Sequence, residues 1–221
     1  MLVSFDNIID TVINEKVIAL QKVFATFFFT GFIETVPAYS SLAIFYDVVA
    51  IKKHQPAESS AYDFVKKHTE QLIANLGVTV EQNDDSLITV PVHYNGDDLT
   101  DVAYQHGLTV AELINIHTEK IYRVFMIGFQ PGFAYMGKLD ERIATPRKVS
   151  PRTYVPQGSV GIAGFQTGIY PFSSPGGWQL IGQTPLKIFD KEKKNPCLIK
   201  AGDHIKFTSI SKEEFKKRNE Y

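Results

Sequence analysis

Residues 156–182 read PQGSVGIAGFQTGIYPFSSPGGWQLIG and decide the fold of this 221-residue chain. No charged residue lies between Arg152 and Lys187, although 21% of the chain is charged. Ten of the fifteen glycines and seven of the eleven prolines fall between Gly128 and Pro185. Such a segment is too broken for a helix and too rich in apolar and aromatic residues for a disordered linker. It predicts short strands joined by tight turns, whose glycines allow close approach of another backbone or a ligand.

The overall composition sets the class of protein. With 221 residues and 44% hydrophobic content, the chain can form one large domain or two small ones. A formal net charge of −1 gives no electrostatic reason to expect nucleic acid or an anionic membrane as partner. The single cysteine, Cys197, has no internal partner for a disulfide, and the N-terminus lacks a signal-peptide pattern. These features predict a cytoplasmic protein, and the longest apolar run, residues 23–29, is too short to span a bilayer.

The N-terminal part alternates strands and helices. The apolar pattern begins at once in Met1–Phe5, as in the tail of a strand whose start has been truncated. The elements that follow are a helix capped by Asn14 and stopped near Gly31, strands at 32–36 and 41–46, a helix capped by Ser60 and ended by Gly77, and a strand at 87–94. This order predicts a small α+β domain with a ferredoxin-like split unit over residues 1–85, while the strand from Leu87 can belong to either side of the boundary.

The C-terminal part predicts a β-barrel over residues 86–221. Two short helices, 98–106 and 110–118, flank Gly107, and every segment from Tyr122 onward has the pattern of strand or turn. Gly202-Asp203, followed by Ile205, Phe207 and Ile210, predicts a last hairpin, and residues 212–221 form a charged, exposed tail. The two short helices have the outline of a DNA-binding helix-turn-helix, but no basic residue precedes Lys120 in the second helix. Packing of both helices on the barrel is therefore the favoured interpretation.

A second local motif imitates a phosphate-binding loop. Residues 132–138 match that loop until Leu139, which replaces the serine or threonine that would hold magnesium. Phe133 and Tyr135 are bulky where the loop must wrap around phosphates, so the match is accidental. The histidines other than His117 show no metal-ligand spacing, and the serines match no Gly-x-Ser-x-Gly nucleophile elbow.

Four of the five arginines lie within thirty residues: Arg123, Arg142, Arg147 and Arg152. A guanidinium is a planar, permanently charged fork that suits a carboxylate or phosphate, so these residues predict an anion site. For Arg142, surface salt bridging with Asp140 is an equal alternative. For Arg147 and Arg152, in proline-flanked loops, contact with a ligand or partner is favoured.

Two further residues have a functional and a structural interpretation. His117, shortly before the strand at Tyr122, can act as a general acid or base, or can be a helix-end histidine hydrogen-bonded to backbone. Trp178, with Gln179 beside it, can offer a stacking surface to a flat ligand or partner strand, or can plug the end of the barrel.

Several long motifs resemble one family. They are GFQPGFAYMG (128–137), TPR (145–147), SPR (150–152), VPQGSVGIAG (155–164), QTGIYP (166–171) and SPGGWQLIG (174–182). Together they resemble the B subunit of bacterial ATP-dependent 5-oxoprolinase. This family is also described as allophanate hydrolase subunit 1, as the KipI-type inhibitor of a sporulation sensor kinase, and as carboxyltransferase domain, subdomains C and D. Lys138 and Phe165 stand where the family commonly has glycine.

The resemblance implies an α+β N-terminal domain followed by a cyclophilin-like barrel. It implies an ATP-dependent lactam hydrolase that converts 5-oxoproline to glutamate together with its A and C subunits, and that has little activity alone. ATP is then a cofactor of the complex. The alternatives are a non-enzymatic inhibitor of a sensor histidine kinase, which would use the glycine-rich face as its interface, and subunit 1 of an allophanate hydrolase.

The expected site residues follow from these patterns. Arg147 and Arg152, with the backbone amides around residues 158–161, would face negative charge developing on the lactam, and His117 would shuttle a proton. The residues expected to contact substrate or partner are Arg123, Phe129, Pro131, Phe133, Tyr135, Gly158, Ser159, Gly161, Gln166, Tyr170, Pro175, Gly176, Trp178 and Gln179.

Overall fold

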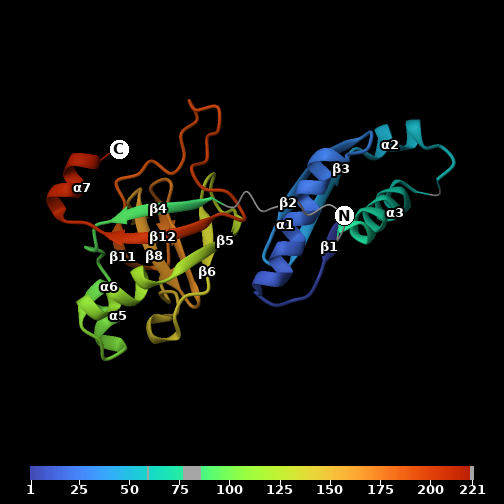
Figure 1. Ribbon diagram of the computed structural model, residues 1–221. Helices are drawn as coiled ribbons and strands as arrows, with labels where there is room; N and C mark the ends of the chain where they lie inside the picture. The colour runs from blue at the N-terminus through green and yellow to red at the C-terminus, as the bar shows by residue number, and fades with distance from the viewer. Residues whose placement is uncertain (59, 77–85, 220–221) are drawn as a thin grey trace. The chain divides into compact units, whose positions relative to one another are not determined.

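The computed structural model describes residues 1–58, 60–76 and 86–219 (Figure 1). The chain divides into two compact units, residues 1–84 and residues 85–221. Within the described residues, no helix is both long and apolar enough to cross a bilayer.

The first unit packs helices on an antiparallel sheet (Figure 1). Its elements are β1 (Leu2–Ser4), α1 (Thr11–Thr26), β2 (Phe32–Pro37), β3 (Ser41–Tyr46), α2 (Val48–His54) and α3 (Ala61–Ala74). The strand order is β1-β3-β2, with Leu2 opposite Ala43 and Val36 also opposite Ala43. The core joins apolar residues of α1, β3, α2 and α3, which include Val17, Leu20, Phe24, Leu42, Ile44, Ile51 and Val65.

The predicted start of the first helix is wrong by one turn. The cap is Asp10, whose carboxylate accepts a hydrogen bond from the Ile13 amide at 3.0 Å. Asn14 lies inside the helix, is buried, and donates to the carbonyl oxygens of Ala38 and Tyr39. An asparagine that serves the tertiary structure therefore has the same local pattern as a capping residue.

The other predicted helix ends are confirmed only in part. Helix α1 ends at Thr26, well before Gly31, whose positive φ of 93° serves the turn into β2 instead. Ser60 does cap α3, since its hydroxyl accepts from the Asp63 amide at 3.0 Å. The sequence pattern does not predict α2, and Gly77 lies outside the described residues.

The ferredoxin-like arrangement of the first unit is not confirmed. The strand expected to complete it is β4 (Leu87–Val92), which pairs in parallel with β12 (His204–Ser209) in the second unit. Val90 and Val92 are fully buried in the core of that unit. The apolar run of β4 is therefore satisfied by the second unit.

The second unit is a sheet curled into a barrel (Figure 1). Within the described residues the strand order is β11-β8-β9-β6-β5-β12-β4. The added strands are β5 (Ile121–Ile127), β6 (Ala134–Gly137), β8 (Ser159–Ala163), β9 (Gln166–Ile169) and β11 (Gln179–Gln183). The two outer strands meet where His93 and Gln183 exchange backbone hydrogen bonds of 2.8 and 2.9 Å, so the sheet closes on itself.

The interior of this barrel is filled by side chains from every wall. Val124, Met136, Ile162, Ile181 and Phe207 are all fully buried in one cluster. Two helices, α5 (Leu99–Gln105) and α6 (Val110–Glu119), add Val102, Leu113 and Ile116 to the same cluster. Both helices thus use their apolar faces for the barrel core, as favoured over DNA binding.

Two smaller findings correct the sequence expectations here. Gly202 is followed by β12, which pairs with β4 and β5 and is not part of a hairpin in the described residues. The segment after Tyr122 also contains η1 (Glu141–Ile143) and α7 (Lys212–Arg218), so it is not made of strand and turn alone. Helix α7 buries no residue, and a capping box between Ser211 and Glu214 supplies its local stability. Residues 134–137 of the phosphate-loop-like stretch form β6, which pairs with β5 and β9.

Candidate functional site

The glycine-rich stretch builds a second layer outside the barrel wall, which we call the outer aromatic layer: Phe133, Tyr135, Tyr170 and Trp178. In β8 and β9, Val160, Ile162 and Ile169 face the barrel core, so the alternating residues Gly161 and Gly168 face outward. The outer aromatic layer packs there with Val155, Ala163 and Leu180. A two-stranded sheet, β7 (Arg152–Val155) with β10 (Ser174–Gly176), adds Val155 to this cluster.

Phe133 lies at the centre of the outer aromatic layer. Its ring makes edge contacts with Tyr135, Tyr170 and Trp178 at centroid distances of 4.8, 5.2 and 5.4 Å. Edge-to-face contacts of this kind are the favoured geometry of aromatic pairs. Phe129, which is 64% exposed and has a positive φ of 69°, extends the layer through an edge contact with Phe133 at 5.5 Å.

The glycines make room for these rings. A Cβ on Gly168 would lie 3.0 Å from the Trp178 ring and 3.1 Å from that of Phe133. A Cβ on Gly176 would lie 2.5 Å from the Tyr170 hydroxyl, and one on Gly161 would lie 3.1 Å from the Cβ of Trp178. The expectation of close approach is therefore correct: aromatic side chains come near in all three places, and at Gly168 the Ala134 carbonyl oxygen of the neighbouring strand does so too, at 3.0 Å.

Trp178 takes neither of its two expected positions. Its indole is only 4% exposed, so it offers no bare stacking surface, and it packs against the outer face of the wall, not inside the barrel. Its outer side is covered by Arg147, whose guanidinium carbon lies 5.7 Å from the ring centroid.

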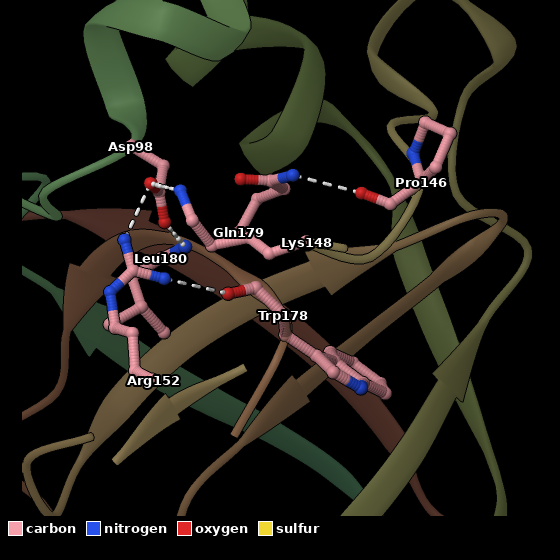
Figure 2. A network of polar contacts seen from close by, with 7 residues as sticks. All are labelled: Asp98, Pro146, Lys148, Arg152, Trp178, Gln179 and Leu180. Atoms are coloured by element: carbon pink, nitrogen blue, oxygen red, sulfur yellow. Dashed lines mark hydrogen bonds and ion pairs between the residues drawn. The ribbon is translucent and has the colours of Figure 1, made fainter. Parts of the chain in front are cut away.

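Beside this layer, one buried carboxylate holds two cations (Figure 2). Asp98 is 2% exposed, and its Oδ1 lies 2.7 Å from Lys148 Nζ and 2.6 Å from Arg152 Nη2. Its Oδ2 accepts from the Leu180 amide at 2.7 Å, while the Asp98 amide donates to the Leu180 carbonyl at 3.0 Å. The start of α5 is thereby tied to β11, to β7 and to the loop that carries Lys148.

Electrostatics favour the charged form of Asp98. Burial alone would raise its pKa, but the hydrogen bonds from Arg152, Lys148 and the Leu180 amide hold that pKa below its ordinary value. The carboxylate is therefore ionised at neutral pH, and its single charge balances one of the two cations.

Arg152 is consequently not a free anion-binding residue. Besides Asp98, its guanidinium reaches the Trp178 carbonyl oxygen at 3.4 Å, and Figure 2 shows the indole pointing away from this network. The geometry favours a positioning role for Arg152 over the predicted direct contact with substrate.

The backbone amides near residue 158 do not form an anion site. The Gly158 amide donates to the Tyr170 carbonyl at 2.8 Å, and the Ser159 amide donates to the Pro156 carbonyl at 3.2 Å. Val160 and Gly161 lie in β8, which is paired on both sides, with β9 and β11. The prediction that these amides face an oxyanion is wrong, because the sheet already uses them.

His117 lies in the barrel interior with both ring nitrogens hydrogen-bonded. Tyr94 Oη is 2.7 Å from Nδ1, and Thr167 Oγ1 is 3.0 Å from Nε2 and itself donates to the Gly161 carbonyl at 3.1 Å. This chain of bonds fixes a neutral imidazole that accepts at Nδ1 and donates at Nε2. Complete burial lowers the pKa of His117 to about 3, which favours a structural role over the predicted proton shuttle.

The remaining predicted residues are spread over different surroundings. Arg142 forms the surface ion pair with Asp140, at 3.0 Å. Arg123 and Ser159 are buried, Gln166 is half-buried, and Pro131 and Pro175 are exposed. Gln179 donates to the Pro146 carbonyl at 2.9 Å and so steadies the loop before Arg147 (Figure 2). Lys138 and Phe165, the two departures from the family pattern, contact each other, with Lys138 Nζ 5.8 Å from the ring.

Sequence reasoning missed Asp98 and Lys148. The available signal was the uncharged stretch after Arg152, because cations at the border of such a stretch need a buried partner. The partner itself lies 54 residues before Arg152 and 50 before Lys148. Among the residues that the structure describes, no group of three or more metal-ligand side chains gathers.

Comparison with known proteins places the chain. The model of the carboxyltransferase domain, subdomain C and D, matches residues 1–199. The B subunit of 5-oxoprolinase from Bacillus subtilis (strain 168) is 45% identical over 211 residues, which are 92% of this chain and 88% of that protein.

Solved structures agree at the level of the fold. The crystal structure of TTHA0988 is 29% identical and matches with a TM-score of 0.82 over 96% of this chain and 40% of its own. The K. lactis urea amidolyase, 20% identical, matches with a TM-score of 0.71 over 97% of this chain and 14% of its own, and therefore shows the fold alone. By its family model and its similarity over nearly full length to a 5-oxoprolinase B subunit, the chain belongs to the carboxyltransferase domain, subdomain C and D, family.

Proposed function

We propose that this chain acts as the B subunit of a heteromeric, ATP-dependent 5-oxoprolinase, which hydrolyses the lactam 5-oxoproline to glutamate together with its A and C subunits. The observation that carries the proposal is the 45% identity to the B. subtilis protein over 88% of that protein's length. That relative is named as one subunit of an enzyme, which also supports a heteromeric assembly.

The described part of the chain supports a shared site. Residues 132–138 do not fit the phosphates of ATP, because 134–137 form a strand paired on both sides. This segment is therefore not assigned to ATP, and no step on this chain involves the nucleotide. The exposed Arg147, with the exposed Phe129 at the edge of the outer aromatic layer, is the part of this chain assigned to substrate.

The chemistry gives the cation a purpose. A lactam is a stable amide, and attack of water on its carbonyl carbon places negative charge on the carbonyl oxygen. A guanidinium that approaches either this oxygen or the substrate carboxylate lowers the energy of the charged species. Asp98, Lys148 and Arg152 then act as a frame, by which we mean the network that holds the strands and loops around Arg147 in place. Arg152→Ala would therefore disturb this frame as well as any contact with substrate.

The test is release of glutamate from 5-oxoproline in the presence of ATP, measured with this chain alone, with the A and C subunits, and with those two subunits without this chain. Turnover only in the full mixture supports an obligatory role for this chain. Turnover that does not depend on this chain contradicts the proposal.

Allophanate hydrolysis is the second candidate, and a stretch of 74 residues that is 39% identical to the urea amidolyase of Saccharomyces cerevisiae supports it. The same mixtures supplied with allophanate in place of 5-oxoproline separate the two. Turnover of allophanate alone would replace the lactamase proposal. Activity on neither substrate would leave the inhibitor of a sensor kinase as the hypothesis to test next, by kinase autophosphorylation with and without this chain.

A further inference from the structure

The three cations beside the outer aromatic layer are not equivalent. Lys148 and Arg152 both contact Oδ1 of Asp98, at 2.7 and 2.6 Å. Arg147 is exposed, and no carboxylate of the described residues lies within ion-pair distance of it. Of these three cations, Arg147 is therefore the one without a carboxylate partner among the described residues.

Arg147 is also held in place, unlike an ordinary surface arginine. Its guanidinium lies over the Trp178 ring at 5.7 Å. On one side of it, the Pro146 carbonyl accepts from the Gln179 side chain at 2.9 Å, as Figure 2 shows. On the other side, the Lys148 amide donates to the Gly177 carbonyl at 2.7 Å, and the Lys148 side chain is tied to Asp98. Because the backbone on both sides of Arg147 is held and its guanidinium lies on a ring, the side chain has less conformational entropy to lose when it binds an anion.

The surroundings provide more than charge. Burial raises the pKa of Tyr135 and of Tyr170, and the positive charge of Arg147 opposes that rise in both. Both phenols therefore lie within electrostatic range of the guanidinium and stay protonated at neutral pH. Phe129, 64% exposed, adds an apolar surface through its contact with Phe133. A cation beside the half-buried Tyr135 and an apolar border suits a small organic acid better than a strongly hydrated inorganic anion.

We infer that Arg147 is the residue that binds the carboxylate of the substrate, with the Asp98 network as the frame that positions it. The inference rests on the proposed function, because the carboxylate is the only charged group of 5-oxoproline at neutral pH. A planar guanidinium can meet that carboxylate with two parallel hydrogen bonds, which a lysine cannot do.

The experiment uses the reconstituted complex and the variant Arg147→Gln. We expect the KM for 5-oxoproline to rise by at least about tenfold, since a charge-assisted pair is lost, while the KM for ATP stays unchanged. Arg147→Lys should recover part of the loss. Arg142→Gln is the matched control, because Arg142 is an exposed arginine that pairs with Asp140 and has no contact with the layer in the described structure; it should behave as the wild type.

A second arm uses 2-pyrrolidinone, which is the same lactam without the carboxylate. The wild type should bind 2-pyrrolidinone, measured as a competitive inhibitor, much more weakly than 5-oxoproline, and Arg147→Gln should reduce this discrimination. A variant with an unchanged KM for 5-oxoproline, or with undiminished discrimination, overturns the inference while the proposed function stands. A rise in the KM for ATP instead would assign Arg147 to a phosphate and also overturn it. A wild-type complex without turnover removes the proposed function, and the inference with it.

Discussion

The two sides of the barrel wall treat buried polar groups in opposite ways. Inside, His117 is neutral and lies in a closed chain of hydrogen bonds from Tyr94 to the Gly161 carbonyl. Outside, Asp98 is ionised and holds two cations, and a third cation, Arg147, faces solvent. The inner group has both ring nitrogens satisfied by the protein, whereas the outer group leaves a net positive charge.

This contrast separates a polar group that stabilises the fold from one that is available to a ligand. A neutral residue with every hydrogen bond satisfied specifies the packing of the core and exchanges no proton with solvent near neutral pH. A held but unneutralised cation is suited to an anionic ligand.

The largest effect is expected on the outer side, for Asp98→Ala. Removal of the carboxylate leaves Lys148 and Arg152 without their partner and the Leu180 amide without its acceptor, so the second unit should lose about 3–5 kcal/mol of unfolding free energy. Asp98→Asn should lose less, because the amide oxygen can still accept from Leu180. Urea unfolding of the full chain measures both. Equal losses for the two variants would show that the lost charge, which both variants share, accounts for the whole effect and that the hydrogen bond to the Leu180 amide contributes nothing.

Next comes the packing of the outer aromatic layer, tested by Gly168→Ala. The new methyl group would lie 3.0 Å from both the Ala134 carbonyl oxygen and the Trp178 ring, and we expect a loss of about 3 kcal/mol. Gly107→Ala is the control, since Gly107 has a positive φ of 66° but no atom within 4 Å of the added Cβ. It should lose only the cost of a left-handed alanine, about 1 kcal/mol. Similar losses in the two variants would contradict the packing argument.

The sequence predicted those features of the two sides that arise between residues near each other along the chain, and not those that join distant residues. The glycines and aromatics of 156–182 are local neighbours whose pattern predicts short strands and turns, and the strands β8, β9 and β11 confirm it. The Asp98 network was not predictable in this way, because its cations are 50 and 54 residues distant and only the folded sheet brings them together.

The same reasoning explains the errors at Asn14 and Arg152. Local rules for helix caps give Asn14 and Asp10 similar weight, and a tertiary contact to residues 38 and 39 decides between them. A proline-flanked loop likewise predicts exposure for Arg152 but cannot reveal a buried carboxylate opposite it. For Arg147 no such partner exists among the described residues, so its prediction as a ligand-binding residue stays open to test.

The inner side predicts a pH dependence of stability. His117 has an ordinary pKa of 6.5 when unfolded and a pKa of about 3 in the fold, so the unfolded chain takes up this proton first as the pH falls. The contribution of His117 is therefore fully present above pH 6.5 and declines by about 2 kcal/mol between pH 7 and pH 5. Asp98, with its pKa below the ordinary 3.8, contributes no change in this window.

The matched variant for this prediction is His117→Gln, which keeps hydrogen-bonding capacity but cannot titrate. At pH 7 it should be less stable than the wild type, because its amide fits the ring cavity poorly. The difference between the two proteins, measured by urea unfolding, should narrow by about 2 kcal/mol at pH 5. A difference that stays constant between pH 7 and pH 5 would mean that the fold does not lower the pKa of His117. The proton shuttle would then have to be tested again.

The smallest effect on stability is expected for Arg147, the residue with the largest proposed effect on substrate binding. Arg147→Gln removes one exposed cation from the face of Trp178, which costs less than about 1 kcal/mol of unfolding free energy. Arg152→Gln should cost clearly more, because Asp98 then keeps only Lys148 as its cation. Thermal unfolding of the two variants side by side, with this chain alone in solution, is sufficient to compare them. If Arg147→Gln proved as damaging as Arg152→Gln, both arginines would belong to the frame, and the outer side of the wall would offer no held cation to a ligand.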